Sequence, residues 1–321
     1  MHRDQLPELL TALATETRIA SITASNAIEG VNVSGDRLEG LIDGGPDRRF
    51  RNRSEREFAG YRDAIDEVTG APALERVTVP YILHLHRQLF RHIDLGGGRL
   101  KTDENLIVSH ERGHREVIFS PPPPSQTESL LVALVDAHDE AVSTHAAHPV
   151  LLVGAFVLDF LAIHPVADGN GRLARLLTAH LLLQQDYQVI RYASVEHRMF
   201  LTKHAYYAAL QASQRGWHEA THDVWPWMDY LVTTLGEAYD DFEARIRARR
   251  NLSGLSKQDR VREYIRHHAP PVFRVRDVRA ALPGVSDPTI RLGLAQLRAA
   301  GEIEIDETAG GRGPQAAWSR R

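Results

Sequence analysis

The residues best suited to chemistry lie between positions 164 and 175, in "HPVADGNGRLAR". His164 can take a proton from a hydroxyl, and Asp168 can hold Mg²⁺ together with phosphate oxygens. Glycines let a ligand approach the backbone, and the amides at the start of a following helix favour an anion. Two arginines three residues apart share a helix face and can clamp a polyphosphate. The set predicts that a hydroxyl, deprotonated by His164, attacks a phosphorus atom of a bound nucleoside triphosphate.

Each piece of this motif has a simpler interpretation when it occurs alone. A histidine before proline is usually structural, a Gly-Asn-Gly is usually a turn, and two arginines at this spacing usually form a solvated helix face. Their occurrence in this order within twelve residues favours a functional site over coincidence.

The motif must be positioned by the elements on either side of it. The run "VLLVGAFVLDFLAI" (150–163) is too short to span a bilayer and contains Asp159, so it predicts a buried helix ending just before His164. The periodicity of apolar residues predicts further helices at 4–28, 53–68, 78–92, 125–146, 171–185, 196–212 and 222–250. Between them, 29–49 is broken by glycines, and "NLIV" and "EVIF" around a polar turn predict a β-hairpin within 93–124.

Composition narrows the class of protein. The chain has 321 residues, 43% hydrophobic and 25% charged, which is typical of a globular protein with two or three domains. It has no cysteine, which excludes disulfides, thiolate zinc sites and a cysteine nucleophile. The N-terminal residues lack an apolar signal core, so we expect a cytoplasmic protein with no membrane partner.

Other catalytic motifs are missing from the sequence or occur in an unsuitable context. There is no Gly-x-x-x-x-Gly-Lys-Ser/Thr loop and no Gly-x-Gly-x-x-Gly, so a P-loop nucleotidase and a dinucleotide-binding oxidoreductase lack support. His-Glu-x-x-His occurs twice among the 17 histidines, as "HERGH" (110–114) and "HEATH" (218–222). The first falls on the turn of the expected hairpin, and the second ends where the expected helix 222–250 begins. A zinc hydrolase needs both histidines on one face of a helix, so that class lacks support as well.

The C-terminal part differs from the rest in charge. Residues 257–321 contain 12 lysines and arginines against 8 acidic residues, whereas the whole chain has a net charge of −4. After a linker at 251–258, three helices and a hairpin ("EIEID" and "AAWS") follow the order of a winged-helix domain, with Asp287 as the expected N-cap of the third helix. Thr289, Arg291, Arg298 and the wing residue Arg312 would face DNA, although such domains also bind proteins.

The motif at 164–175 resembles the signature of Fic-domain proteins, His-x-Phe-x-Asp/Glu-Gly-Asn-Gly-Arg-x-x-Arg, with Val166 in place of phenylalanine. "GGGRLKTDENLIVSHERGHREVIFSPPPP" resembles the glycine segment, hairpin flap and double proline of the family. "HAYYAALQ" (204–211) resembles the helix whose tyrosines, here Tyr206 and Tyr207, border the adenine. The resemblance implies a mainly α fold: a Fic-type helical bundle with a β-hairpin flap, followed here by a small α+β winged-helix domain.

The resemblance also implies an activity, which is transfer of AMP from ATP to a protein hydroxyl. His164 would be the base and Asp168 the Mg²⁺ ligand; Gly169, Asn170 and Gly171 would hold phosphates; Arg172 and Arg175 would bind the β- and γ-phosphates. Glycine at position 171 favours nucleotide transfer over phosphorylation. The target protein would dock on the flap at 106–118 by strand addition.

A second stretch, "SNAIEG" (25–30), resembles the inhibitory motif of the same family. Glu29 would pair with Arg175 and turn ATP into an unproductive pose. Ser25 stands at the Ser/Thr position that begins the motif. AMP removal, transfer of another nucleotide, and a nucleotide-sensing transcription regulator remain alternatives, and a homodimer is a candidate assembly. We expect an N-terminal helical segment with the inhibitory helix (1–50), a Fic catalytic domain (51–250) and a winged-helix domain (257–321).

Overall fold

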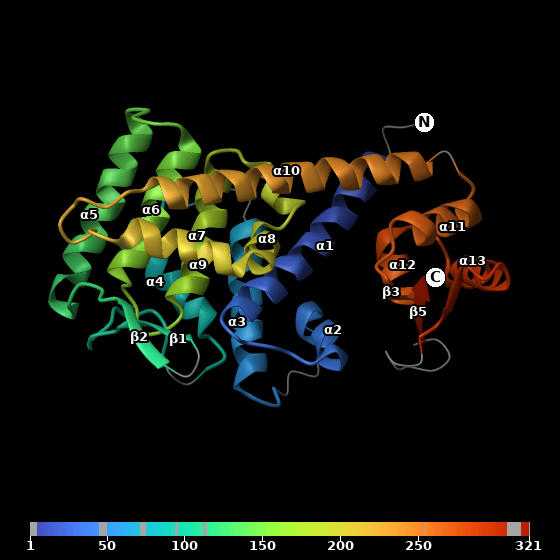
Figure 1. Cartoon of the computed structure of the whole chain (residues 1–321), viewed down its shortest axis with the longest axis horizontal. Helices are drawn as coiled ribbons and strands as arrows, with labels where there is room; N and C mark the ends of the chain where they lie inside the picture. The colour runs from blue at the N-terminus through green and yellow to red at the C-terminus, as the bar shows by residue number, and fades with distance from the viewer. Residues whose placement is uncertain are drawn as a thin grey trace. The chain divides into compact units, whose positions relative to one another are not determined.

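The computed structural model of the chain describes residues 5–44, 50–70, 75–93, 96–111, 114–253, 255–306 and 316–320. The described residues are mainly helical, with two small antiparallel sheets (Figure 1). They divide into two compact units, one of Thr17–Ala238 and one of Met1–Glu16 with Tyr239–Arg321. Helices α1 (Gln5–Ile28) and α10 (Trp225–Ser253) each contribute residues to both units.

The candidate site lies in the Thr17–Ala238 unit, around two central helices. Helix α6 (Pro149–Ile163) packs against α7 (Asn170–Gln184), and the two lie side by side in Figure 1. Helix α5 (Pro124–Ser143) packs on α6, while α3 (Arg53–Gly70) and α4 (Val79–Leu89) pack on α7 and on each other. Because α6 is apolar apart from Asp159, most of its residues are buried, and its end fixes the place where the motif begins.

The remaining elements of this unit cover the central pair. Helix α9 (Lys203–Gln214) packs on α6 and, with α8 (Val195–Leu201), follows the short 3₁₀ helix at Gln188–Arg191. The predicted hairpin is present as strands β1 (Ile107–Glu111) and β2 (His114–Phe119), which pair antiparallel from Ile107 opposite Phe119 to Glu111 opposite His114. Its second strand lies against α9.

The C-terminal residues form a small α+β unit with its own core. In order, its elements are α11 (Lys257–His267), β3 (Val272–Arg274), α12 (Val275–Ala281), α13 (Asp287–Ala299), β4 (Ile303–Ile305) and β5 (Ala317–Arg320). The strands form one antiparallel sheet in the order β3-β5-β4. Val261, Phe273, Ile290 and Leu294 lie in its buried core. This order is consistent with a winged helix; Arg312, predicted on the wing, lies outside the described residues.

Several predicted boundaries are wrong, each for a local reason. The segment 29–49, interpreted as broken, contains helix α2 (Gly35–Asp43), because glycine at the first position of a helix does not stop it. The predicted helix 196–212 is two helices, interrupted at Thr202, whose hydroxyl bonds to Tyr230 Oη over 2.8 Å. Helix α10 continues to Ser253, so its last residues take up part of the expected linker, and the N-cap of α13 is Ser286 rather than Asp287.

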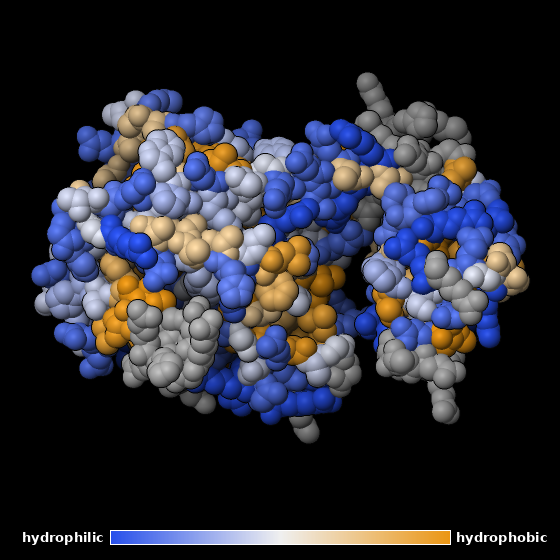
Figure 2. All heavy atoms as spheres, in the orientation of Figure 1, coloured by the Kyte–Doolittle hydropathy of each residue, from blue (hydrophilic) through white to orange (hydrophobic). Residues whose placement is uncertain are grey.

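The surface of the molecule is mostly hydrophilic, with separate apolar patches (Figure 2). Exposed large apolar side chains include two close to or on the hairpin, Leu106 and Val117, and two at the end of α8, Phe200 and Leu201. Among the helices within the described ranges, none is both long and apolar enough to cross a membrane.

Candidate active site

His164 ends α6 in a conformation that turns the chain sharply into the motif. Its backbone is left-handed, with φ 50° and ψ 60°, and its N–H still bonds to the Phe160 carbonyl. Its Nδ1 lies 3.2 Å from the carbonyl oxygen of Leu161. A carbonyl only accepts, so Nδ1 carries the proton and Nε2 has the lone pair that a base needs. Burial lowers the pKa of His164 to about 4, so the ring is neutral at pH 7.

The loop after His164 is held from behind by two residues of the glycine-rich segment. Lys101 donates from Nζ to the Ile163 carbonyl (3.1 Å) and to Asn105 Oδ1 (2.9 Å). Asn105 in turn donates from Nδ2 to the carbonyls of His164 (3.1 Å) and Val166 (3.0 Å). Burial lowers the pKa of Lys101 to about 8. These contacts fix the path of the backbone on which His164 depends.

Asn170 and Gly169 complete the turn into α7. The Asn170 side chain accepts from the Val166 N–H (3.1 Å) and donates to the Val166 carbonyl (2.6 Å). Its carboxamide is therefore engaged by the loop itself, and contact with a phosphate would fall to the backbone amide at this helix start. Gly169 has φ 86°, and a Cβ there would lie 2.8 Å from the Phe90 ring, so only glycine fits. Val166, in the position of the usual phenylalanine, is fully buried.

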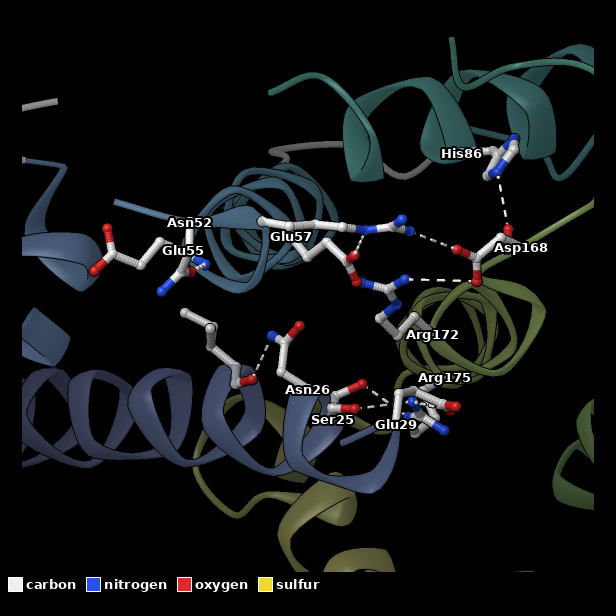
Figure 3. Close-up of polar contacts among 12 residues, drawn as sticks. Ser25, Asn26, Glu29, Asn52, Glu55, Glu57, His86, Asp168, Arg172 and Arg175 are labelled. Carbon is white, nitrogen blue, oxygen red and sulfur yellow. Dashed lines mark hydrogen bonds and ion pairs between the residues drawn. The ribbon is translucent and has the colours of Figure 1, made fainter. Parts of the chain in front are cut away.

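Arg175 is paired with Glu29, the contact expected from the inhibitory motif. Its Nη2 donates to Glu29 Oε1 over 2.8 Å and to the Ser25 carbonyl over 3.0 Å, and its Nε donates to the Ser25 hydroxyl over 2.7 Å. Figure 3 shows Ser25 of α1 and Glu29, just beyond the end of that helix, converging on Arg175 of α7. The side chain of Arg175 is 2% exposed and that of Glu29 is 31% exposed. Nη1 of Arg175 is buried with no hydrogen-bond partner among the described residues.

The Glu29 carboxylate also lies directly against the first turn of α7. A Cβ on Gly171 would be 2.3 Å from Glu29 Oε1, so the carboxylate occupies the space that glycine leaves open. Burial would raise the pKa of Glu29, but the charge and hydrogen bond of Arg175 outweigh burial and lower it. Lys203 supports this arrangement from α9, because its Nζ donates to the Ile28 carbonyl over 2.6 Å. The carboxylate is thus an anion held over a helix N-terminus, beside a buried arginine.

Arg172 faces a different partner. Its Nη1 donates to Glu57 Oε2 on α3 over 2.7 Å, and its guanidinium stands 5.5 Å from the Phe90 ring centroid. Glu57 also accepts from Arg53 Nε, 2.5 Å from its Oε1, and Arg53 Nη2 reaches Asp168 Oδ2 over 3.2 Å. Arg172 and Arg175 are therefore both buried, but they point to different neighbours of α7, Glu57 and Glu29 (Figure 3).

His86 fixes the backbone at Asp168. The N–H of Gly98 donates to His86 Nδ1 (2.9 Å), so the ring proton is on Nε2, which lies 3.1 Å from the Asp168 carbonyl oxygen. Burial lowers the pKa of His86 to about 4 and keeps the ring neutral. The Asp168 side chain is left exposed to solvent at the edge of the site.

The residues of the site suit a metal ion that binds together with a nucleotide. No cluster of three or more histidine, cysteine or acidic side chains exists in the part of the chain that is described. Asp168 is a single exposed carboxylate, and Mg²⁺ is commonly held by one or two carboxylates together with substrate phosphates. The residues therefore suit a metal that arrives with a nucleotide, and they do not form a site that the protein completes alone.

The two tyrosines expected at the adenine have separate environments. Tyr206 is buried, with its ring 5.9 Å from Trp227 and 5.8 Å from Tyr230. Tyr207 is exposed, and the ammonium of Lys203 lies 5.8 Å from its ring centroid. Of the pair, only Tyr207 is exposed, and its ring lies 5.1 Å from that of Tyr206 in a tilted arrangement.

Comparison with known proteins identifies the unit that contains this site. Residues 76–182 match the family model described as the Fic/DOC family. The chain is a Fic-domain protein. The matched range contains the whole motif from His164 to Arg175, together with the loop residues Lys101 and Asn105 and the flap.

Curated relatives carry the same family name. A protein adenylyltransferase Fic of Culex quinquefasciatus is 27% identical over 157 residues, which are 49% of this chain and 27% of the relative. One of Nematostella vectensis is 24% identical over 240 residues, covering 71% of this chain and 49% of the relative. One of Drosophila melanogaster is 30% identical over 112 residues, covering 35% and 21%. The chain thus spans from about a fifth to half the length of these relatives.

Solved structures share the fold. A Fic family protein from Desulfovibrio desulfuricans G20 has a TM-score of 0.60 at 22% identity, covering 96% of this chain and 87% of that chain. Fic-1 from C. elegans (residues 134–508) has a TM-score of 0.55 at 19% identity, covering 72% and 64%.

Within the Fic domain, most of the residues predicted from sequence come together, and several others join them. His164, Gly169, Asn170, Gly171, Arg172 and Arg175 surround the start of α7, with Glu29 and Ser25 against it and Asp168 at its edge. Sequence reasoning missed Lys101, Asn105, His86, Glu57 and Arg53. The first two could have been found as polar residues four apart behind a glycine run, but the others lie on helices of ordinary appearance.

Proposed function

We propose that this Fic-domain protein transfers AMP from ATP to a hydroxyl side chain of a target protein or of itself, and that Glu29 holds it inactive at rest. The observation that carries the proposal is the Glu29 carboxylate against Gly171 and Arg175. An anion already sits over the first turn of α7 and on a buried arginine, where a nucleotide phosphate would bind. Ligand and inhibitor therefore compete for one cationic position.

The proposed chemistry uses the neutral ring of His164. Nε2 takes the proton of the target hydroxyl, the hydroxyl oxygen forms a bond to the α-phosphorus, and the bond from that phosphorus to the pyrophosphate oxygen breaks. The amides at the start of α7 and the Nη1 of Arg175 would stabilise the negative charge on the phosphates. Asp168 would hold Mg²⁺, which would supply further positive charge to the phosphates.

Release of Glu29 is the step that would switch the enzyme on. Glu29 lies just beyond the end of α1, next to Gly30 with φ 77°, so its side chain can leave Arg175 without unfolding the helix. Arg175 would then bind the γ-phosphate, and ATP would lie with its α-phosphorus in line with the target hydroxyl. The names of the relatives, protein adenylyltransferase, support this reaction over phosphate transfer.

The flap is the proposed docking edge for the target. Its strands β1 and β2 form a two-stranded sheet, so an outer edge is open to a further strand. Leu106 and Val117 provide exposed apolar contacts close to and on the hairpin. Within the predicted docking segment 106–118, the side chains of residues 109–116 are not among those that the structure describes.

The experiment that tests the reaction type compares two labels. The Glu29→Gly variant is incubated with Mg²⁺ and ATP labelled at either the α- or the γ-phosphate, and protein-bound label is measured. AMP transfer predicts protein labelled from the α-position alone. Label from the γ-position would instead identify phosphate transfer and contradict the proposal.

The C-terminal α+β unit, which we propose is a winged helix, has a groove that could receive a partner. Its volume is about 690 Å³, with Arg291 and Arg298 of α13 beside an apolar surface formed by Leu294, Val275 and Trp318. A DNA or protein partner for this unit remains a prediction, as do the homodimer and the cytoplasmic location. A salt-dependent shift of duplex DNA by the intact chain would favour DNA.

A further inference from the structure

Arg172 is poorly placed to bind a ligand, although the motif suggests that role. Its side chain is only 3% exposed, its Nη1 is held by Glu57 over 2.7 Å, and the Phe90 ring covers its guanidinium. Glu57 is itself buried on α3. A buried arginine with a buried carboxylate as partner ties two helices together, here α3 and α7, and moving it toward a ligand would leave Glu57 Oε2 without its buried partner.

Arg53 is the exposed cation of the same network. It stands at the first position of α3, and Glu57 Oε1 accepts from its Nε over 2.5 Å. The outer edge of its guanidinium points to Asp168, with Nη2 3.2 Å from Oδ2, and the Arg53 side chain is 57% exposed. Glu57 therefore holds one arginine inside the fold with one oxygen, and presents a second arginine at the edge of the site with the other.

We propose that Arg53 is a further nucleotide-binding residue of this Fic domain, contributing from α3 the phosphate contact that the sequence assigns to Arg172. Glu57 is the positioning residue that aims it. The proposal rests on the proposed function in taking a nucleoside triphosphate as the ligand. A planar guanidinium suits phosphate oxygens, and Arg53 gives up only a solvent-exposed contact with Asp168 to bind them.

The location of Arg53 also determines which part of the ligand it would contact. It reaches the carboxylate of Asp168, just before the start of α7, whereas Arg175 lies within that helix and pairs with Glu29. Arg53 and Arg175 would therefore contact the polyphosphate from two different helices, α3 and α7, and neither would contribute to binding of the nucleoside.

The test measures ligand affinity in Glu29→Gly protein, where Arg175 is released. Binding of ATP and of adenosine is measured by competition with a fluorescent ATP analogue, for the parent and for the added changes Arg53→Gln and Arg53→Lys. Arg76→Gln serves as the matched control, because Arg76 is an equally exposed arginine paired with an aspartate, Asp139, outside the site. Thermal melts check that each variant is folded.

We expect Arg53→Gln to weaken ATP binding about fivefold to tenfold, the loss typical of one charge-assisted contact at an exposed site, and to leave adenosine binding within about twofold. Arg53→Lys should restore most of the loss, and Arg76→Gln should have no effect. The loss should persist in EDTA, because the guanidinium contacts phosphate directly.

Three results would overturn the inference. Unchanged or tighter ATP binding by Arg53→Gln would mean that Arg53 only neutralises Asp168. A loss seen only with Mg²⁺ would mean that it acts through that carboxylate. If the parent itself binds no ATP, the proposed function fails and this inference fails with it, whereas an unaffected variant of an ATP-binding parent removes the inference alone.

Discussion

Arg172 and Arg175 stand three residues apart on α7 and are equally buried, but their carboxylate partners differ in kind. Glu57 lies within α3 and is almost fully enclosed, whereas Glu29 lies beyond the end of α1 and its side chain is 31% exposed. Glu57 also holds Arg53, while Glu29 occupies an anion position over Gly171. One motif arginine therefore links two helices, and the other is a cation whose partner, under the proposed function, is exchanged for a ligand.

The largest expected effect is on stability, and it should differ between variants of Glu57 and variants of Glu29. Glu57→Ala leaves the cation of Arg172 buried without its partner, which should lower the free energy of unfolding by about 3–5 kcal/mol. Glu29→Ala should cost only about 1 kcal/mol, because Ser25 still accepts from Arg175 and water can enter. Urea unfolding followed by tryptophan fluorescence suits this comparison, since Trp217, Trp225 and Trp227 all lie in the Fic unit. Equal losses would contradict the distinction.

A second change fills the space that Gly171 leaves open. In Gly171→Ala the new Cβ would stand 2.3 Å from Glu29 Oε1, so the carboxylate must shift. The methyl group would also take the space proposed for the phosphate, so we expect Gly171→Ala to lower AMP transfer by the Glu29→Gly protein about tenfold, or roughly 1.4 kcal/mol. Gly40→Ala is the control, because a Cβ there meets nothing within 4 Å. Equal AMP transfer by the Glu29→Gly protein with and without Gly171→Ala would show that no phosphate binds against position 171.

A smaller effect is expected at the end of the inhibitory helix. Lys203 donates to the Ile28 carbonyl and places a positive charge near Glu29. Lys203→Met keeps the length of the side chain but removes both contributions, so we expect AMP transfer to rise about threefold, or roughly 0.6 kcal/mol. The same change in Glu29→Gly protein should give no further rise. A rise of equal size in both backgrounds would assign Lys203 a role unrelated to Glu29.

The smallest expected effect is a lack of change with pH. His164 acts as a base only when neutral, and burial lowers its pKa to about 4, so it stays neutral as pH falls through 6.5. Glu29→Gly protein should therefore transfer AMP at the same rate from about pH 6 to pH 8, with loss only at more acid pH. A rate that halves near pH 6.5 would mean that His164 is better solvated in the working enzyme.

The sequence predicts the partner of Arg175 better than the partner of Arg172. The helices flanking the motif follow from an apolar run and a short loop, and the pairing of Glu29 with Arg175 follows from a family-like pattern. Glu57 is different: it lies 115 residues from Arg172, in a helix rich in charged residues, where nothing local marks it as buried. The sequence also did not predict that the Asn170 side chain bonds to the backbone of Val166. Nor did it predict that Tyr206 is buried against Trp227, because both contacts depend on tertiary packing.

The central claim is that Glu29, by occupying Arg175 and the start of α7, keeps a competent AMP transferase inactive. The most direct test incubates wild type, Glu29→Gly, His164→Ala and the double variant with Mg²⁺ and α-labelled ATP, and measures protein-bound label over time. The account predicts strong labelling of Glu29→Gly, weak labelling of wild type and none once His164 is replaced. Equal labelling of wild type and Glu29→Gly would contradict the inhibition, and ATP binding without label in any variant would contradict AMP transfer itself.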